Sequence, residues 1–320
     1  MNPRALVVGL VSTVCWCGLM LAVNAAGVEP LRFGPLQRLT NGETVLTLHT
    51  AAGVTCRVDV SSSLVEWTPL VSLVGGATVR HTDSGAPFVA QRFYRAVLTN
   101  VIPGDFLATT AGPAIIHPGN HAGFMMLWGN HAIYVDPVTN VYAGLPKATL
   151  ILLTHDHADH LNNTTLSAVI DPVVGRIVAP QATYNNLSTA LKGVAQVLTN
   201  GGVLQWSELT IEAVPMYNLS TSYHPRGRGN GYVVTLGGRR IYISGDTDNT
   251  PEVRALTNID VAFVCMRPPY CMSVTDAAQA VRAFRPRVVY PYHYLGNDVN
   301  LFKQLVGTDL GIEVRLRSWY

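Results

Sequence analysis

Three histidines and two aspartates lie within residues 154–160, directly after a continuous apolar run at residues 148–153. Such a run is typical of a strand buried on both faces, and α/β proteins build their sites on the loops that leave strand ends. The first two histidines are two positions apart, so in an extended segment their rings project to one side, while Asp159 and the third histidine follow a bend. An ordinary solvated loop is disfavoured, because three of the ten histidines fall here. The segment predicts a metal site, and one loop can supply two ions.

The rest of the chain from residue 105 alternates strands with helices. The order indicates a layered α/β domain of two similar halves. The predicted strands lie at 113–117, 122–128, 131–135, 148–153, 208–214, 231–236, 239–243, 261–264, 288–290 and 312–317. The predicted helices lie at 162–170, 181–191, 275–284 and 299–306, with a further helix from Pro251.

Residues 27–104 carry a different pattern. Short runs alternate apolar and polar side chains with a period of two, and Asn-Gly, Gly-Gly and Ser-Gly turns separate them. This alternation predicts antiparallel strands, and no helix-period segment interrupts it. We therefore expect a small all-β module that ends in a turn-rich linker at residues 99–104, and a total length of 320 residues agrees with two domains.

Residues 1–26 form a predicted export signal. Arg4 precedes an uncharged apolar stretch at residues 6–23, and small residues follow it. A retained membrane anchor is the alternative, because a spanning helix needs about 20 apolar residues. We expect removal, an exported protein in the periplasm or outside the cell, and no stable membrane span in the mature form. Of the remaining cysteines, Cys265 and Cys271 either pair or stay reduced.

Charge excludes one class of partner. Lys and Arg number 22 against 20 Asp and Glu, which gives a net charge of +2, and no basic run of five or more occurs. Nucleic acid is therefore not expected as a partner. Hydrophobic residues make up 48% of the chain and charged residues only 13%, against a usual charged share of about 25%, so the chain is globular with a sparingly charged surface.

Three separated motifs carry a family resemblance. His-x-His-x-Asp-His follows the strand predicted at 148–153, Ser-Gly-Asp-Thr at 244–247 follows the strand predicted at 239–243, and Pro-Tyr-His-Tyr at 291–294 follows the strand predicted at 288–290. Their order and their places at strand ends resemble the metallo-β-lactamase superfamily of metal-dependent hydrolases, over about residues 107–320. The resemblance implies the αβ/βα four-layer sandwich, preceded here by the small all-β module. It implies two divalent ions at one edge, with zinc as the expected metal and manganese or iron as alternatives.

Two shorter stretches narrow the resemblance. Asn120-His121-Ala122 is similar to the Gly-His-Ala stretch of the branch that includes ascorbate-phosphate-lactonase-like and N-acylphosphatidylethanolamine-phospholipase-like proteins, with Asn in place of Gly. The pattern around Trp67 and Phe93 resembles a β-module that recurs in secreted bacterial proteins.

The resemblance also implies the ligands. One ion takes His155, His157 and a third histidine. The other ion takes Asp159, His160 and His293, and Asp246 lies between the two ions. Many relatives place the third histidine directly after the strand that ends near Pro215, where this chain has Tyr-Asn. A subset places it later, before a proline, and His224 fits that pattern.

Several other side chains are predicted to shape the pocket. Asp159 and His121 are the predicted catalytic residues; a packed strand histidine is the alternative for His121. Asp136 is predicted to orient a metal-bound histidine, unless it is a turn aspartate before proline. Arg226 and Arg228 either meet an anionic substrate group or are solvated.

The predicted reaction is hydrolysis of an ester, lactone, amide or phosphodiester bond by a hydroxide shared between the two ions, on a small-molecule or lipid-like substrate. The sequence indicates no particular oligomeric state for the protein. One alternative is an exported binding protein with a vestigial metal site, in which the β-module binds a surface or a glycan. A flavodiiron oxidoreductase of the same superfamily is disfavoured, because those proteins carry Glu where this chain has His157.

Overall fold

The computed structural model describes residues 6–11, 20–21, 31–50, 55–75, 78–99 and 102–320. Contacts divide the chain into two units, one of residues 1–108 and 113–117 and the other of residues 109–112 and 118–320. The signal segment lies largely outside the described residues. Its removal, and the boundaries 27–104 and 105–320 as separate working domains, stay predictions.

The first unit consists of antiparallel strands, as the period-two pattern predicted. Strand β5 pairs with β3, β4 and β8, while β6 pairs with β7 and β9. Alternate side chains on β5 are buried, and Leu46 and Leu48 pack with Val58 and Tyr94 in one apolar core. The strands are β1 (Leu6–Val11), β2 (Met20–Leu21), β3 (Arg32–Phe33), β4 (Gln37–Arg38), β5 (Thr44–His49), β6 (Thr55–Ser61), β7 (Thr68–Val74), β8 (Val79–Asp83), β9 (Arg92–Leu98), β10 (Gly104–Leu107) and β11 (Ala114–Pro118), with a 3₁₀ turn η1 (Ala86–Phe88).

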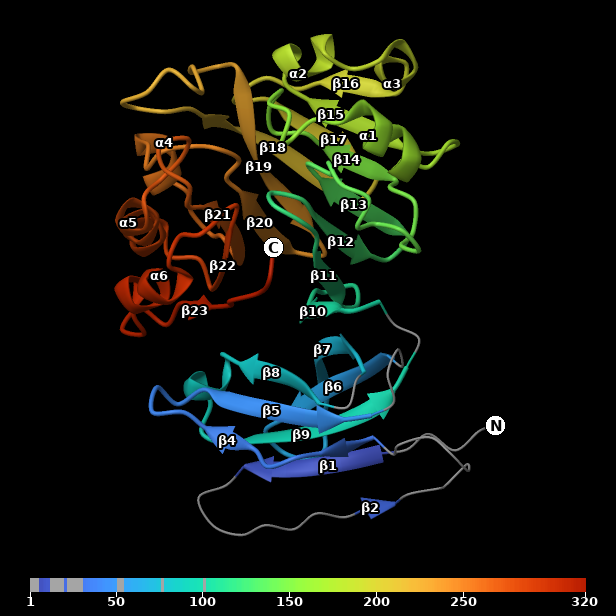
Figure 1. The fold of residues 1–320 in the computed structure, drawn as a ribbon, viewed down its shortest axis with the longest axis vertical. Helices are drawn as coiled ribbons and strands as arrows, with labels where there is room; N and C mark the ends of the chain where they lie inside the picture. The colour runs from blue at the N-terminus through green and yellow to red at the C-terminus, as the bar shows by residue number, and fades with distance from the viewer. Residues whose placement is uncertain (1–5, 12–19, 22–30, 51–54, 76–77, 100–101) are drawn as a thin grey trace. The chain divides into compact units, whose positions relative to one another are not determined.

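The second unit contains two sheets with helices outside them (Figure 1). In the first sheet the strands run in the order β12 (Phe124–Trp128), β13 (His131–Val135), β14 (Leu150–Leu152), β15 (Arg176–Ala179) and β16 (Ala195–Val197). The second follows chain order: β17 (Val203–Trp206), β18 (Leu209–Met216), β19 (Gly229–Leu236), β20 (Arg239–Ile243), β21 (Val261–Cys265), β22 (Val288–Tyr292) and β23 (Glu313–Val314). The helices are α1 (Asn163–Val169), α2 (Gln181–Asn185), α3 (Thr189–Lys192), α4 (Pro251–Arg254), α5 (Val274–Phe284) and α6 (Val299–Val306).

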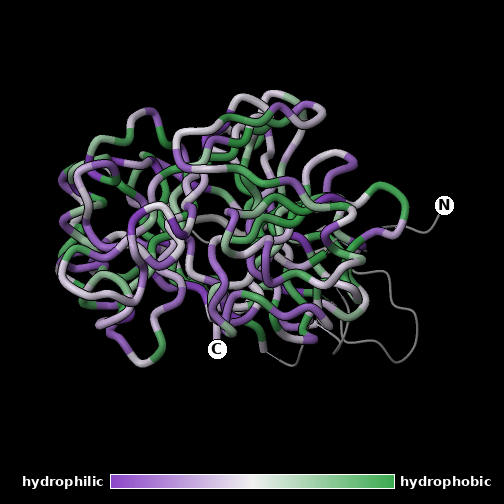
Figure 2. The backbone as a smooth tube through the Cα atoms, turned by 90° about the horizontal axis from the view of Figure 1, so that it is seen from above, coloured by the Kyte–Doolittle hydropathy of each residue, from purple (hydrophilic) through white to green (hydrophobic). Residues whose placement is uncertain are grey.

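The two sheets of this unit pack face to face. Phe124 on β12 stacks on Phe263 of β21 with ring centroids 4.0 Å apart, and Tyr232 of β19 donates to the carbonyl oxygen of Leu153. Every side chain of β14 and β21 is buried, as expected for strands covered on both faces. Hydrophobic and hydrophilic stretches alternate along the tube in Figure 2. The layered α/β fold predicted from the sequence is confirmed.

Most predicted elements of this unit are present, but two predictions were wrong in detail. The helix predicted at 181–191 is two helices, because the Ser188 side chain accepts a hydrogen bond from the backbone of Leu191 and begins α3 there. The closing strand predicted at 312–317 is only the two residues of β23. The predicted cap of α5 is present, since the Ser273 side chain accepts from the Asp276 backbone.

Parallel pairing brings the motif-bearing loops together. β13, β14 and β15 are parallel neighbours, and so are β20, β21 and β22. The carboxyl ends of parallel strands meet at one edge of a sheet, where α/β proteins place their sites. Among the described residues, no helix is long and apolar enough to span a membrane.

Candidate metal centre

The first group of candidate ligands is made of three imidazoles, which we call the histidine cluster: His155, His157 and His224. Their ligand atoms all lie within 4.8 Å of one another, and His224 Nε2 is 3.1 Å from His157 Nδ1. His155 and His157 belong to the loop after β14, whereas His224 belongs to the loop between β18 and β19. That loop folds back, with the backbone N–H of Asn218 donating to the carbonyl oxygen of His224. The structure therefore brings His224 to the place where a third histidine was predicted.

The second group, the mixed cluster, contains His121, Asp159, His160 and His293, whose ligand atoms also lie within 4.8 Å of one another. His121 Nε2 lies 2.9 Å from Asp159 Oδ2 and 2.6 Å from His293 Nε2. His121 has a positive φ of 61°, and its backbone N–H donates to the carbonyl oxygen of Trp319. The predicted pocket position of His121 agrees with this geometry, although its catalytic role stays a prediction.

Asp246 lies between the two clusters, at the end of β20. Its Oδ1 is 2.9 Å from His293 Nδ1 and 3.5 Å from His160 Nε2, and its Oδ2 is 3.8 Å from His224 Nε2. The carboxylate thus faces imidazoles of both groups from one buried position. This agrees with the place predicted for Asp246, between the two groups of candidate ligands.

Polar partners hold three of the imidazoles so that Nε2 of each faces inward. Asp136 Oδ2 accepts from His160 Nδ1 at 2.8 Å, and this carboxylate also accepts from the backbone and the hydroxyl of Thr154. Asn218 Oδ1 accepts from His224 Nδ1 at 2.8 Å. Thr154 Oγ1 lies 3.0 Å from His155 Nδ1. Partners of this kind fix the tautomer and the orientation of a metal-binding histidine, so the predicted role of Asp136 agrees with its contacts.

Two inward-facing imidazole nitrogens of this site, His155 Nε2 and His160 Nε2, are buried and make no hydrogen bond within the described part of the chain. Asp246 Oδ1 and His293 Nδ1 are buried as well, and their close polar contact is with each other, at 2.9 Å. Buried polar atoms in proteins are normally satisfied, and an unsatisfied one is costly. Imidazole nitrogen and carboxylate oxygen are the donor set that divalent zinc takes. The residues present therefore fit bound metal.

The electrostatics favour metal-binding protonation states for two of these side chains. Burial, helped by the neighbouring His160, lowers the pKa of His155 well below its ordinary value, which keeps the ring neutral. Burial opposes ionisation of Asp246, but the nearby His293 and His160 outweigh it and hold the pKa of this carboxyl well below the usual range. A neutral imidazole and an ionised carboxylate are the forms that bind a metal.

Sequence reasoning missed Arg267, which lies two residues beyond the end of β21. Its Nη1 is 3.1 Å from Asp159 Oδ2, 3.1 Å from His121 Nε2 and 3.3 Å from His293 Nε2. Tyr320 was missed as well, and its hydroxyl is 3.1 Å from His121 Nδ1. The available signal for Arg267 was its place after a strand that lies between two motif-bearing strands.

Other residues singled out by the sequence belong to neither cluster, although the Cys271 sulfur lies within 4.8 Å of ligand atoms of Asp246 and His293. Arg226 pairs with Glu252, and Arg228 pairs with Asp156 at 2.9 Å. Cys265 and Cys271 are both free and buried, so the alternative of a disulfide between them is not realised.

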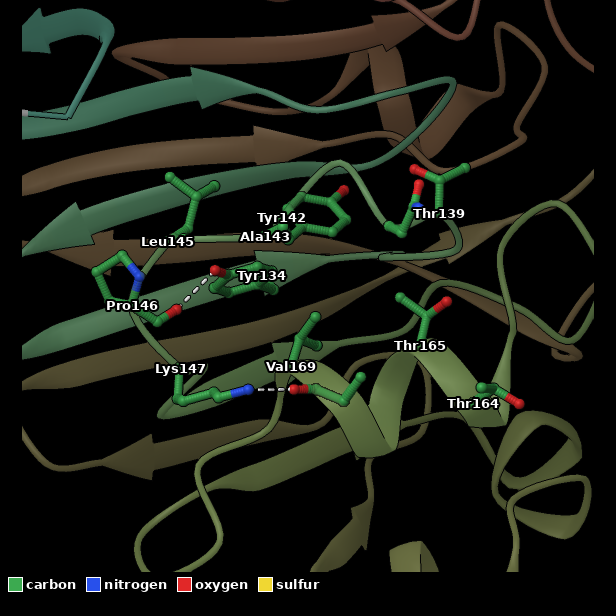
Figure 3. A pocket seen from close by; sticks show the side chains of 13 residues that line it. Tyr134, Thr139, Tyr142, Ala143, Leu145, Pro146, Lys147, Thr164, Thr165 and Val169 are labelled. Atoms are coloured by element: carbon green, nitrogen blue, oxygen red, sulfur yellow. Dashed lines mark hydrogen bonds between the residues drawn. The ribbon is translucent and has the colours of Figure 1, made fainter.

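A separate cavity of about 530 Å³ lies beside α1 (Figure 3). Tyr134, Tyr142 and Lys147 line it, and the Tyr134 hydroxyl donates to the carbonyl oxygen of Pro146. Neither cluster contributes a side chain to its wall.

The fold and the two clusters define the class of a metal-dependent hydrolase with the metallo-β-lactamase architecture. A family model described as a β-lactamase superfamily domain matches residues 116–293, more than half of the chain. The chain belongs to this superfamily.

Named relatives agree with this assignment. The chain is 32% identical over 207 residues to a UPF0173 metal-dependent hydrolase of Pyrococcus abyssi, a match that covers 58% of this chain and 89% of the relative. A UPF0173 metal-dependent hydrolase of Thermoplasma acidophilum is 31% identical, over 59% of this chain and 88% of its own.

Solved structures show the same fold. A Parabacteroides distasonis protein described as a metal-dependent hydrolase is 40% identical with a TM-score of 0.62, over 67% of this chain and 97% of its own. Igni18, described as a metallo hydrolase from Ignicoccus hospitalis, is 23% identical with a TM-score of 0.54, over 63% of this chain and 94% of its own, and supports the fold alone.

Proposed function

We propose that this chain is an exported hydrolase that holds two divalent ions, with zinc as the expected metal, and cleaves an ester, lactone, amide or phosphodiester bond. The observation that carries the proposal is the position of Asp246 between two clusters, in which the buried Nε2 atoms of His155 and His160 lack hydrogen-bond partners among the described residues. Divalent ions in such a site lower the pKa of a bound water and polarise the substrate's carbonyl or phosphoryl oxygen.

The chain's own residues divide the work. Asp136 and Asn218 hold His160 and His224 in fixed orientations, which preorganises the site before substrate arrives. Asp159 is different, because 43% of its side chain is exposed. Solvent and substrate can therefore reach the Asp159 carboxylate. This accessibility supports the proposed role of Asp159 in steering the nucleophile.

The position of His121 supports a place in the branch that includes ascorbate-phosphate-lactonase-like and phospholipase-like proteins. The substrate is then a small or lipid-like molecule. A vestigial binding site is not favoured, because every predicted ligand reaches one of the two clusters or Asp246 between them.

A panel of hydrolysis assays tests the proposal. Purified protein with its metal content measured is incubated with 4-nitrophenyl acetate, a γ-lactone and bis(4-nitrophenyl) phosphate, before and after chelation. We expect turnover of at least one substrate, its loss on chelation, and its return with zinc or manganese. His131→Ala is the matched control, since His131 pairs with Glu208 outside both clusters. Turnover that persists in metal-free protein would contradict the proposal.

A further inference from the structure

We infer that Arg267 binds an anionic group of the substrate, carboxylate or phosphate, and that the Tyr223–Tyr270 pair beside it receives an apolar part of the same molecule. This inference rests on the proposed hydrolase function and adds the substrate class. The inference starts from the position of the Arg267 guanidinium, which contacts the mixed cluster. A guanidinium does not bind metal, so this residue needs another role.

The contacts of Arg267 place positive charge at the substrate side of the site. One guanidinium nitrogen touches Asp159, His121 and His293 at 3.1–3.3 Å. Arginine offers five donors in a planar fork, and the contacts to the cluster engage only Nη1. The fork geometry matches carboxylate and phosphate oxygens, which accept two parallel hydrogen bonds from it.

The ion pair between Asp159 and Arg267 is weak enough for Arg267 to exchange Asp159 for another anion. The two side chains are 24% and 43% exposed, and solvent screens an ion pair in such a position. Asp159 is also a predicted metal ligand, so a bound cation competes with the guanidinium for that carboxylate. Arg267 is then free to bind an anion that enters the site.

The other arginines near the site have carboxylate partners that are not candidate ligands. Arg226 pairs with Glu252, and Arg228 pairs with Asp156. The Arg226 and Arg228 side chains are 66% and 52% exposed, which agrees with the predicted alternative of solvated loop arginines. Arg267 differs because its carboxylate partner belongs to the mixed cluster.

An exposed aromatic pair lies next to Arg267. The guanidinium carbon is 5.3 Å from the ring centroid of Tyr270, and the rings of Tyr270 and Tyr223 are 4.8 Å apart. Tyr270 is 36% exposed and Tyr223 is 46% exposed. The backbone of Tyr270 is tied to the site, because its carbonyl oxygen accepts from Asn218. A cation beside exposed aromatic faces suits a molecule with one anionic end and one apolar or flat part.

Two assays on protein with measured metal content test this inference. The first compares 4-nitrophenyl pentanoate with mono-4-nitrophenyl glutarate, which share a leaving group and an acyl chain but differ by a carboxylate in place of the terminal methyl group. The second measures binding of inorganic phosphate by titration calorimetry. The variants are Arg267→Gln, Arg267→Lys and, as matched control, Arg226→Gln.

For Arg267→Gln we expect the KM of the anionic ester to rise about 10- to 100-fold, which is the loss expected for a hydrogen bond between charged groups. The KM of the neutral ester should rise at least about tenfold less than that of the anionic ester, metal content should not change, and phosphate affinity should fall in parallel with the anionic ester. Arg267→Lys should recover part of the loss, and Arg226→Gln should behave as the unmodified protein. Tyr270→Ala, but not Tyr270→Phe, should raise KM for both aryl esters.

Equal losses on the two esters together with unchanged phosphate affinity would overturn the inference. So would a change of metal content in Arg267→Gln, because Arg267 would then act on the metal cluster itself. Should neither ester be turned over at all, the hydrolase proposal fails on these bonds, and the phosphate titration still decides whether Arg267 binds an anion.

Discussion

The histidine cluster and the mixed cluster share Asp246 but are held in different ways. In the histidine cluster, His155 and His224 are 2% and 3% exposed, and their outer partners are the neutral side chains of Thr154 and Asn218. In the mixed cluster, Asp159 is half-exposed and its partners include the cation of Arg267. Under the proposed function, this contrast would let one group retain an ion while the other meets substrate.

The largest expected effect comes from removing the residue that the two groups share. Asp246→Ala should lower kcat/KM by more than about 100-fold, the upper end of what outer ligand partners usually cost, and bound metal should fall at both clusters. Metal analysis and steady-state kinetics measure this. The matched control is Asp309→Asn, since Asp309 is an exposed partner of Arg282. Unchanged metal content in a folded Asp246→Ala protein would remove the shared-ligand role.

The next prediction separates the two groups by one histidine each. His224→Ala should lower bound metal from two equivalents towards one and reduce turnover about 100-fold, because it opens the buried group. His121→Ala should keep both equivalents and change the ratio of kcat/KM between two substrates by about 10-fold. The opposite pattern would make His121 the third ligand and the loop at residues 216–230 a substrate lid.

A smaller effect is expected at Asp136, which contacts a candidate ligand without belonging to either cluster. Asp136→Asn removes the carboxylate that accepts from His160 Nδ1, so the mixed-cluster side should lose metal affinity by about 10- to 100-fold. Competition with a metal-sensitive dye measures the affinity, and thermal unfolding checks that this buried position still folds. An affinity equal to that of the unmodified protein would show that the backbone alone orients His160.

The smallest effect is expected from removing the β-module. Both clusters and Asp246 lie beyond residue 118, so a protein that begins near residue 104 should keep its rate on small substrates within about threefold. Circular dichroism and the same kinetic assay test this. A loss of ten-fold or more, with folding intact, would mean that the module shapes the pocket.

The predictable part of the fold was the part with strong local patterns. The strands at 131–135 and 239–243 and the helix at 299–306 occupy the predicted residues, because their apolar periodicity agrees with their burial. β15 and β16 were missed, since each has only three or four residues and owes its pairing to neighbours distant in sequence. β17 was missed as well; it is short and pairs with β18 in a hairpin that turns at residues 207–208.

The site divides in the same way. Residues of the loop after β14 were predicted because several histidines and aspartates follow an apolar strand directly, and this local pattern is visible in the sequence. Arg267 and Tyr320 have no motif, and only the parallel order of β20, β21 and β22 and the packing near His121 place them at the centre. A single side chain after a strand can be recognised as a site residue only when the order of the strands in the sheet is known.

The central claim is that the two clusters each hold a divalent ion, and metal stoichiometry combined with turnover tests it most directly. Elemental analysis of the purified protein should give two equivalents of divalent metal. Stepwise chelation should remove them in two phases, with hydrolysis lost by the end and restored by zinc or manganese. A single tightly bound equivalent that supports full turnover, or full turnover in metal-free protein, would contradict the account.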